Sequence, residues 1–254
     1  MERKSPEREI MEQGKWIQLT PHVCYLEFQQ QTDRPNLGYI YGKKQALMVD
    51  TGNSAAHVRQ YTKALQRQNA IPPSYAAITH WHWDHTFGMW AVRAQTVATE
   101  KTNAKLQRIR RWEWTDAAMK KRVASGEEIE FCDMHIRKEY PELSEIRVKM
   151  AELVIAGQKL LDLGGVTCRL LPTDSPHSRD AMLIQVVEEG VLFGGDADGE
   201  DFYDGGGQYD KYRLDAYIQL LQVLDFEIYM PGHWHPCTKQ QEIEYLQETY
   251  RNLK

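Results

Sequence analysis

The stretch that decides the fold is HWHWDH at residues 80–85, which follows directly on a short apolar segment, YAAIT. In an extended segment, residues two apart share a face, so His80 and His82 can bind one ion while the tryptophans point the other way. Asp84 and His85 lie beyond the turn, where they can reach a second ion. Imidazole nitrogen and carboxylate oxygen are ligands that zinc and similar divalent metals prefer. The spacing therefore predicts a metal site at the end of a strand.

The chain before this motif is predicted to form a β-meander followed by a helix. Short apolar runs separated by polar, glycine and proline breaks predict strands. These runs cover residues 16–19, 23–28, 39–42, 46–50 and 75–79. Apolar residues at three- and four-residue steps predict an amphipathic helix from about residue 54 to 68, with Asn53 or Ser54 as its N-cap.

The chain after the motif begins with a highly charged segment and then returns to strands. Residues 102–156 have a helical composition, which predicts a helical insertion. Further strands and helices follow at residues 160–163, 166–171, 182–187, 191–193, 211–224, 227–230 and from 239 onward. Strands and helices therefore occur in two similar blocks, which is typical of an α/β fold. We expect one domain over residues 1–254.

The composition restricts the class of protein and its partners. The chain has 254 residues, of which 42% are hydrophobic and 26% charged, so it can bury a large core. Its formal net charge of -5 disfavours nucleic acid and an anionic membrane surface as partners. The four cysteines lie far apart, which argues against a disulfide framework. The first fifteen residues hold no apolar stretch for a signal peptide or membrane span, so we expect a cytoplasmic protein. The composition leaves open whether the chain forms a homo-oligomer.

The H-x-H-x-D-H stretch resembles the defining motif of the metallo-β-lactamase superfamily. Further motifs of this family occur in the same order, so the resemblance spans about residues 16–235. They are Asp-Thr-Gly at 50–52, Pro-His-Ser at 176–178, Gly-Gly-Asp at 194–196 and Pro-Gly-His at 231–233. The resemblance implies an αββα sandwich, in which two mixed β-sheets pack face to face with helices outside.

The resemblance also implies a dinuclear metal site. One metal would be bound by His80, His82 and His177. The other would be bound by Asp84, His85 and His233, with Asp196 between the two ions. We expect two divalent ions, with zinc as the first choice and iron or manganese as alternatives. The local sequence is consistent with this, because Asp196 follows an apolar strand and a Gly-Gly pair that lets the backbone approach a cofactor closely.

The chemistry expected of such a site is metal-assisted hydrolysis. A metal-bound hydroxide would attack an ester, thioester, lactone or amide-like bond of a small-molecule substrate. Asp84 is the candidate catalytic residue, because it can orient or deprotonate that water. The stretch Thr-Phe-Gly at 86–88 lacks the small residues and paired glycines of glyoxalase II-like enzymes, which disfavours a glutathione thioester.

Three other functions are open alternatives on the same residues. The first is an iron-dependent, dioxygenase-like oxidoreductase, and the second is a phosphodiesterase or nuclease. The third is a non-catalytic metal-bound scaffold that works through the helical insertion. The presence of all seven candidate ligands argues against the scaffold, because decay of a site is expected to remove some of them.

A few residues outside the ligand set have candidate roles. Asp50 is expected to orient a ligand or the strand-end backbone by hydrogen bonding. His235 is a candidate substrate contact, or a histidine without a metal role. Arg179 could hold a substrate carboxylate or phosphate, with a structural ion pair as the favoured alternative. The remaining histidines are expected at ordinary surface or helix positions. Four aromatic residues could line a substrate cleft or serve in packing. These residues are His22, His57 and His135, and Trp112, Trp114, Tyr203 and Tyr209.

Overall fold

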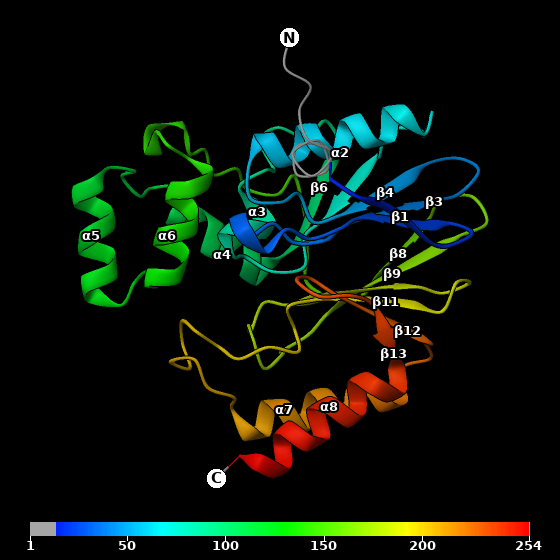
Figure 1. Ribbon diagram of the computed structural model, residues 1–254. Helices are drawn as coiled ribbons and strands as arrows, with labels where there is room; N and C mark the ends of the chain where they lie inside the picture. The colour runs from blue at the N-terminus through cyan, green and yellow to red at the C-terminus, as the bar shows by residue number, and fades with distance from the viewer. Residues whose placement is uncertain (1–13, 254) are drawn as a thin grey trace.

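The computed structural model describes residues 14–253 as two β-sheets packed face to face with helices on their outer sides (Figure 1). The first sheet contains β1 (Trp16–Thr20), β2 (Val23–Leu26), β3 (Leu37–Tyr41), β4 (Ala46–Val49), β5 (Tyr75–Ala77), β6 (Gln95–Thr99) and β7 (Leu153–Ile155), in that spatial order. The second contains, in spatial order, β13 (Cys237–Thr238), β12 (Ile228–Pro231), β11 (Val191–Gly195), β10 (Met182–Val186), β9 (Thr167–Pro172) and β8 (Lys159–Asp162). The predicted αββα sandwich is confirmed.

Both sheets are mixed. In the first sheet β1 to β4 pair antiparallel as a meander, and β4 to β7 then pair in parallel. In the second sheet β8 to β11 pair antiparallel, whereas β11 and β12 are parallel. Parallel strands end at the same edge of a sheet, so the ends of β4 and β5 lie side by side. The sequence places its Asp-Thr-Gly turn and its histidine motif at these two ends.

The main core lies between the sheets. Fully buried apolar residues from both sheets meet there, including Ile40 and Leu47 from the first and Leu170 and Ile184 from the second. Burying each side chain of this size stabilises the fold by about 1.5–3 kcal/mol. These buried residues belong to the apolar runs from which the strands were predicted.

Helices lie on the outer faces of the two sheets, and a further pair lies beside the sandwich (Figure 1). They are α2 (Ala55–Arg67), α3 (Trp83–Thr86), α4 (Glu100–Ile109), α5 (Asp116–Ser125), α6 (Glu130–Glu139), α7 (Lys211–Val223) and α8 (Lys239–Asn252), with short 3-10 turns η1 (Gln30–Thr32) and η2 (Leu143–Glu145). The α2 helix packs Tyr61 and Leu65 on the first sheet, and its predicted N-cap Ser54 accepts a hydrogen bond from the His57 backbone. The α7 and α8 helices pack Leu214 and Leu246 on the second sheet.

The structure differs from expectation at two strands, one before the predicted helical insertion and one inside it. Strand β6 was not predicted, and β7 lies inside the predicted helical range and pairs in parallel with β6. The error has a physical reason, because β7 has only three residues and gives no periodic signal of its own. The α5 and α6 helices stand beside the sandwich, at the end where α3 lies (Figure 1). The division into one domain with an insertion at 102–156 stays a prediction.

None of the helices in residues 14–253 is long and apolar enough to cross a membrane. The expectation about the leading fifteen residues falls almost entirely outside the described range, which begins at residue 14.

Candidate metal centre

The ends of β4 and β5 are joined by the Asp50 carboxylate. The Thr79 backbone N–H donates to Asp50 Oδ1 at 2.7 Å, and the Thr79 hydroxyl donates to Asp50 Oδ2 at 2.8 Å. The same Oδ2 lies 2.8 Å from His85 Nδ1. Asp50 therefore contacts both the strand-end backbone and a motif histidine, the two positions expected for it from the sequence.

The first candidate ligand group consists of His80, His82 and His177. One ring nitrogen from each lies within 4.8 Å of the others, and all three side chains are buried. His177 comes from the turn after β9, and its Nδ1 donates to the Glu200 carbonyl at 2.7 Å. That bond leaves His177 Nε2 to face the group, where it lies 2.9 Å from His82 Nδ1.

The second candidate group consists of Asp84, His85, Asp196 and His233. Asp84 Oδ2 lies 2.8 Å from His233 Nε2 and 3.0 Å from His85 Nε2. Asp196 follows β11 and places Oδ2 at 3.3 Å from His85 Nε2 and 3.6 Å from His233 Nε2. The same oxygen is 4.0 Å from His80 Nε2, so Asp196 lies between the two groups.

The electrostatics of the first group favour neutral imidazoles. Burial lowers the pKa of His80 and of His82 well below the usual histidine value, and the neighbouring imidazoles lower both further. A neutral imidazole has a free lone pair on one nitrogen, which is the form that binds a metal.

The second group is a set of paired opposite charges. Burial alone would lower the pKa of His85, but three neighbouring carboxylates, led by Asp84, hold it well above its usual value. Burial opposes ionisation of His233 as well, yet Asp196 and Asp84 raise its pKa to about 9. His85 in turn holds the pKa of both carboxylates well below the usual range against the effect of burial.

These residues fit divalent metal ions. Two buried donor atoms, His80 Nε2 and Asp196 Oδ1, have no hydrogen-bond partner among the residues that the structure describes. Leaving such an atom unpaired costs about 1–3 kcal/mol, and a coordinated cation would satisfy both. One group offers three nitrogens, and the other offers two nitrogens and two carboxylates, which are donor sets that zinc, iron and manganese accept. Glycine at position 232 is also consistent with this site, because a Cβ there would overlap Asp196 Oδ1, an atom of a candidate ligand.

Two residues near the groups were missed by sequence reasoning. Thr79 contacts Asp50 and lies 3.0 Å from His80 Nδ1; its position directly before the motif was the available signal. Asp33 has left-handed backbone geometry with φ 54°, and its Oδ1 lies 3.8 Å from His233 Nδ1. Burial and the nearby Asp84 charge raise the pKa of Asp33 to about 7. Its loop carries no motif, so no sequence signal identified it.

The other singled-out residues lie in different surroundings. His235 lies beside His233 but is 61% exposed, with its ring against Phe28. Arg179 pairs with Asp174 at 3.4 Å and lines neither of the cavities that reach the ligand groups. The structure therefore brings Asp50 to the groups, leaves His235 at their edge and keeps Arg179 away.

The remaining histidines and aromatic residues have mostly structural surroundings. His57 occupies a helix as expected, and its side chain is fully buried. Trp112 and Trp114 pack against each other and against the Arg122 guanidinium. Tyr203 differs, because its ring lies 4.9 Å from that of His82 and it lines a cavity at the ligand groups.

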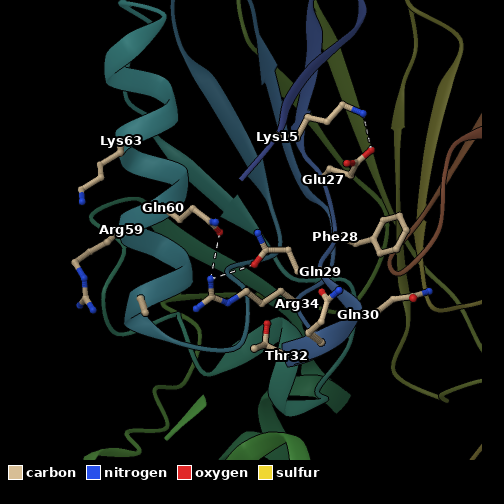
Figure 2. A pocket seen from close by; sticks show the side chains of 12 residues that line it. Lys15, Glu27, Phe28, Gln29, Gln30, Thr32, Arg34, Arg59, Gln60 and Lys63 are labelled. Atoms are coloured by element: carbon tan, nitrogen blue, oxygen red, sulfur yellow. Dashed lines mark hydrogen bonds and ion pairs between the residues drawn. The ribbon is translucent and has the colours of Figure 1, made fainter. Parts of the chain in front are cut away.

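Two cavities reach the candidate ligands, with volumes of about 520 and about 730 Å³. A separate cavity of about 600 Å³ lies between η1 and α2 and is drawn in Figure 2, with Arg34 reaching toward Gln29 and Gln60. Arg59 and Lys63 give that cavity a basic rim. Its lining, as far as the structure describes it, includes no member of the two ligand groups. The candidate chemistry therefore belongs to the first two cavities.

Comparisons with known proteins agree with this geometry. The profile of the Metallo-beta-lactamase superfamily matches residues 32–233. A metallo-beta-lactamase from Pontibacter korlensis has a similar structure, with a TM-score of 0.67, 16% identity and coverage of 94% of this chain and 99% of that one. A metallo-beta-lactamase family protein from Thermus thermophilus gives a TM-score of 0.63 at 18% identity, over 92% of this chain and 81% of that one. The sec-alkyl sulfatase PisA1 gives a TM-score of 0.67 at 15% identity, and the match covers 94% of this chain and 41% of that one. Comparison with curated proteins gives no significant match.

Proposed function

Since this chain belongs to the metallo-beta-lactamase superfamily, we propose that it is a hydrolase with a dinuclear zinc site, which cleaves an ester, thioester, lactone or amide-like bond. Members of the superfamily are hydrolases or related metallo-enzymes, and this chain is an enzyme of that kind. The proposed substrate is a small molecule, and the proposed compartment is the cytoplasm.

The observation that carries the proposal is the convergence of seven donor side chains in two adjacent groups with Asp196 between them. We assign one ion to the three histidines and the other to Asp84, His85 and His233. The unpaired, buried atoms of His80 and Asp196 support this assignment, because they face no other partner in the described chain.

Bound divalent ions supply a water whose pKa is near neutrality and a Lewis acid for the developing oxyanion. The protein's own groups prepare this chemistry. The Asp84 carboxylate stays ionised because His85 holds its pKa low, so it can accept a hydrogen bond that orients the attacking water. Asp50 fixes the ring of His85 through Nδ1, which leaves Nε2 aimed at the site. No nucleophilic serine is needed.

The proposal is tested by replacing His82 or Asp196 with alanine and measuring metal content and turnover together. We expect both variants to bind less metal than the unmodified protein and to lose activity. His22→Ala is the matched control, because His22 is a partly exposed histidine that pairs with Glu189 away from the ligand groups. Full activity in metal-free protein would contradict the proposal.

An iron-dependent oxidoreductase is the second candidate. Two imidazoles and one carboxylate form the set that non-haem iron oxygenases use, and Asp84, His85 and His233 provide it. Elemental composition and oxygen consumption distinguish the two candidates: zinc without oxygen uptake supports hydrolysis, and iron with oxygen uptake supports oxidation.

A further inference from the structure

The cavity of about 520 Å³ has two different walls. One wall is formed by five candidate metal ligands, namely His82, Asp84, His177, Asp196 and His233. An apolar part of the lining comes from the start of α6 and from the loop after β11, namely Ile129, Phe131, Cys132, Phe202 and Tyr203, and Gln30 and Asp33 complete the lining. A molecule that fills this cavity would therefore touch both the proposed reaction centre and an apolar surface.

The apolar wall is unusual in its exposure. Phe131 and Phe202 are 53% and 48% exposed, although they lie beside a ligand-sized cavity. Exposed large apolar side chains at the mouth of a cavity are typical of a binding surface. None of the described residues that line this cavity is a lysine or an arginine, whereas the separate cavity of Figure 2 has Arg59 and Lys63. The apolar wall therefore has no cationic side chain that could pair with an anionic substituent of a ligand.

The apolar wall is also fixed relative to the ligand groups. The Tyr203 hydroxyl donates to Glu128 Oε1 at 2.7 Å, which joins the loop after β11 to the start of α6. The Tyr203 ring lies 4.7 Å from that of Trp81 and 4.9 Å from that of His82, between centroids. Contacts to both the α6 segment and the histidine motif hold the wall in place before a ligand arrives, which reduces the entropy lost on binding.

The second cavity at the ligand groups has a different character. Its lining includes the carboxyl groups of Asp198, Glu200 and Glu242 and the side-chain amide of Gln241. Covering these polar groups with an uncharged alkyl or aryl group would cost them hydrogen bonds to water. An apolar arm therefore fits the α6 side better.

We propose that the α6-side cavity is the subsite for an uncharged alkyl or aryl arm of the substrate, which makes the substrate an acyl compound with an apolar acyl group. Its arm lies against Phe131 and Phe202 while its scissile carbonyl lies at the two ligand groups. This inference rests on the proposed hydrolysis. It also gives the α6 segment a function, which is to supply substrate selectivity.

The test is a homologous series of straight-chain acyl esters or thioesters assayed with the metal-loaded protein. We expect kcat/KM to rise about fourfold per added methylene until the cavity is filled, because each buried methylene contributes a nearly constant transfer free energy. Phe131→Ala should flatten this dependence. Met134→Ala is the matched control, because Met134 is 48% exposed on the same helix and does not line the cavity. Phe202→Ala gives a second variant on an independent segment; because Phe202 also lines the second cavity, Phe131→Ala is the variant that distinguishes the two cavities.

A binding measurement separates this inference from the proposed hydrolysis. Calorimetric titration of the metal-loaded protein with straight-chain carboxylates requires no turnover. Affinity that rises with chain length and falls in Phe131→Ala supports the subsite, even if no ester is hydrolysed and the proposed function fails. Turnover and affinity that are both independent of chain length would overturn the subsite while leaving hydrolysis intact. Equal losses in Phe131→Ala and Met134→Ala would also overturn it.

Discussion

The two candidate ligand groups are adjacent and yet differ in their charge. The group of His80, His82 and His177 contains only imidazoles, and burial favours the neutral form of the first two. The other group contains two carboxylates and two histidines, and its opposite charges stabilise each other. The first group can therefore accept an ion directly, whereas the second must release protons when an ion binds.

The largest effect is expected from removing one ligand of either group. His82→Ala should leave an ion in the second group, and Asp84→Ala should leave one in the first. Each variant should retain about one ion per chain, and kcat/KM should fall more than about 100-fold, which exceeds the usual effect of a residue outside the ligand set. Elemental analysis with steady-state kinetics checks both. Two ions retained in either variant would show that the groups do not act separately.

Asp50→Asn should have the next largest effect. The amide cannot accept from both His85 Nδ1 and Thr79 as the carboxylate does, so the ring of His85 loses its fixed orientation. Metal affinity of the second group should fall about 10- to 100-fold, with a smaller loss at the first. Competition with a coloured chelator measures both affinities. The control is Asp215→Asn on α7, where the carboxylate bonds only Gln219 among the described contacts; an equal loss there would refute the role of Asp50.

The pH dependence of the metal-free protein sharpens the comparison. The pKa of His233 is raised from 6.5 to about 9, so its ion pairs contribute stability fully below pH 6.5. That contribution is lost as the pH rises through about 9, because the folded state then releases the proton as well. We expect the free energy of unfolding to decrease by about 1–3 kcal/mol over this window.

Denaturant unfolding between pH 6 and 10 checks this expectation. His233→Gln should lack most of the decrease, because glutamine carries no titrating proton. In the metal-loaded protein the sign reverses, since protons compete with the ion and the stabilisation by metal should increase with pH. A metal-free protein that became more stable from pH 6.5 to 9 would contradict the charge pairing of the second group.

The smallest effect is expected at the edge of the site. His235 lies two residues after His233 but is 61% exposed, and its ion-pair distance to Glu27 is 3.7 Å. His235→Ala should leave metal content unchanged and alter kcat/KM by less than about threefold, because exposed pairs contribute little. The comparison with His233→Ala, which should lose metal, is the control. Loss of an ion in His235→Ala would place His235 among the ligands.

Particular residues show how far sequence reasoning reached. The predicted strands of the meander, the motif at the end of β5 and the family were confirmed. Strand β7 was missed because three residues give no period, and Asp33 was missed because its loop has no motif. Phe131 and Phe202 could not be paired from sequence, since an exposed aromatic side chain has no pattern that names its neighbour.

The sequence by itself determined the donor atoms, their spacing within residues 80–85 and the order of strands that carries the later motifs. Only the tertiary structure brought Asp84 to His233, which lie 149 positions apart along the chain. Packing the two sheets makes that closure possible, because burial of their shared core offsets the entropy of ordering the intervening chain. The same packing decided the charges of the two groups, since a pKa depends on burial and on neighbours that the linear sequence does not place.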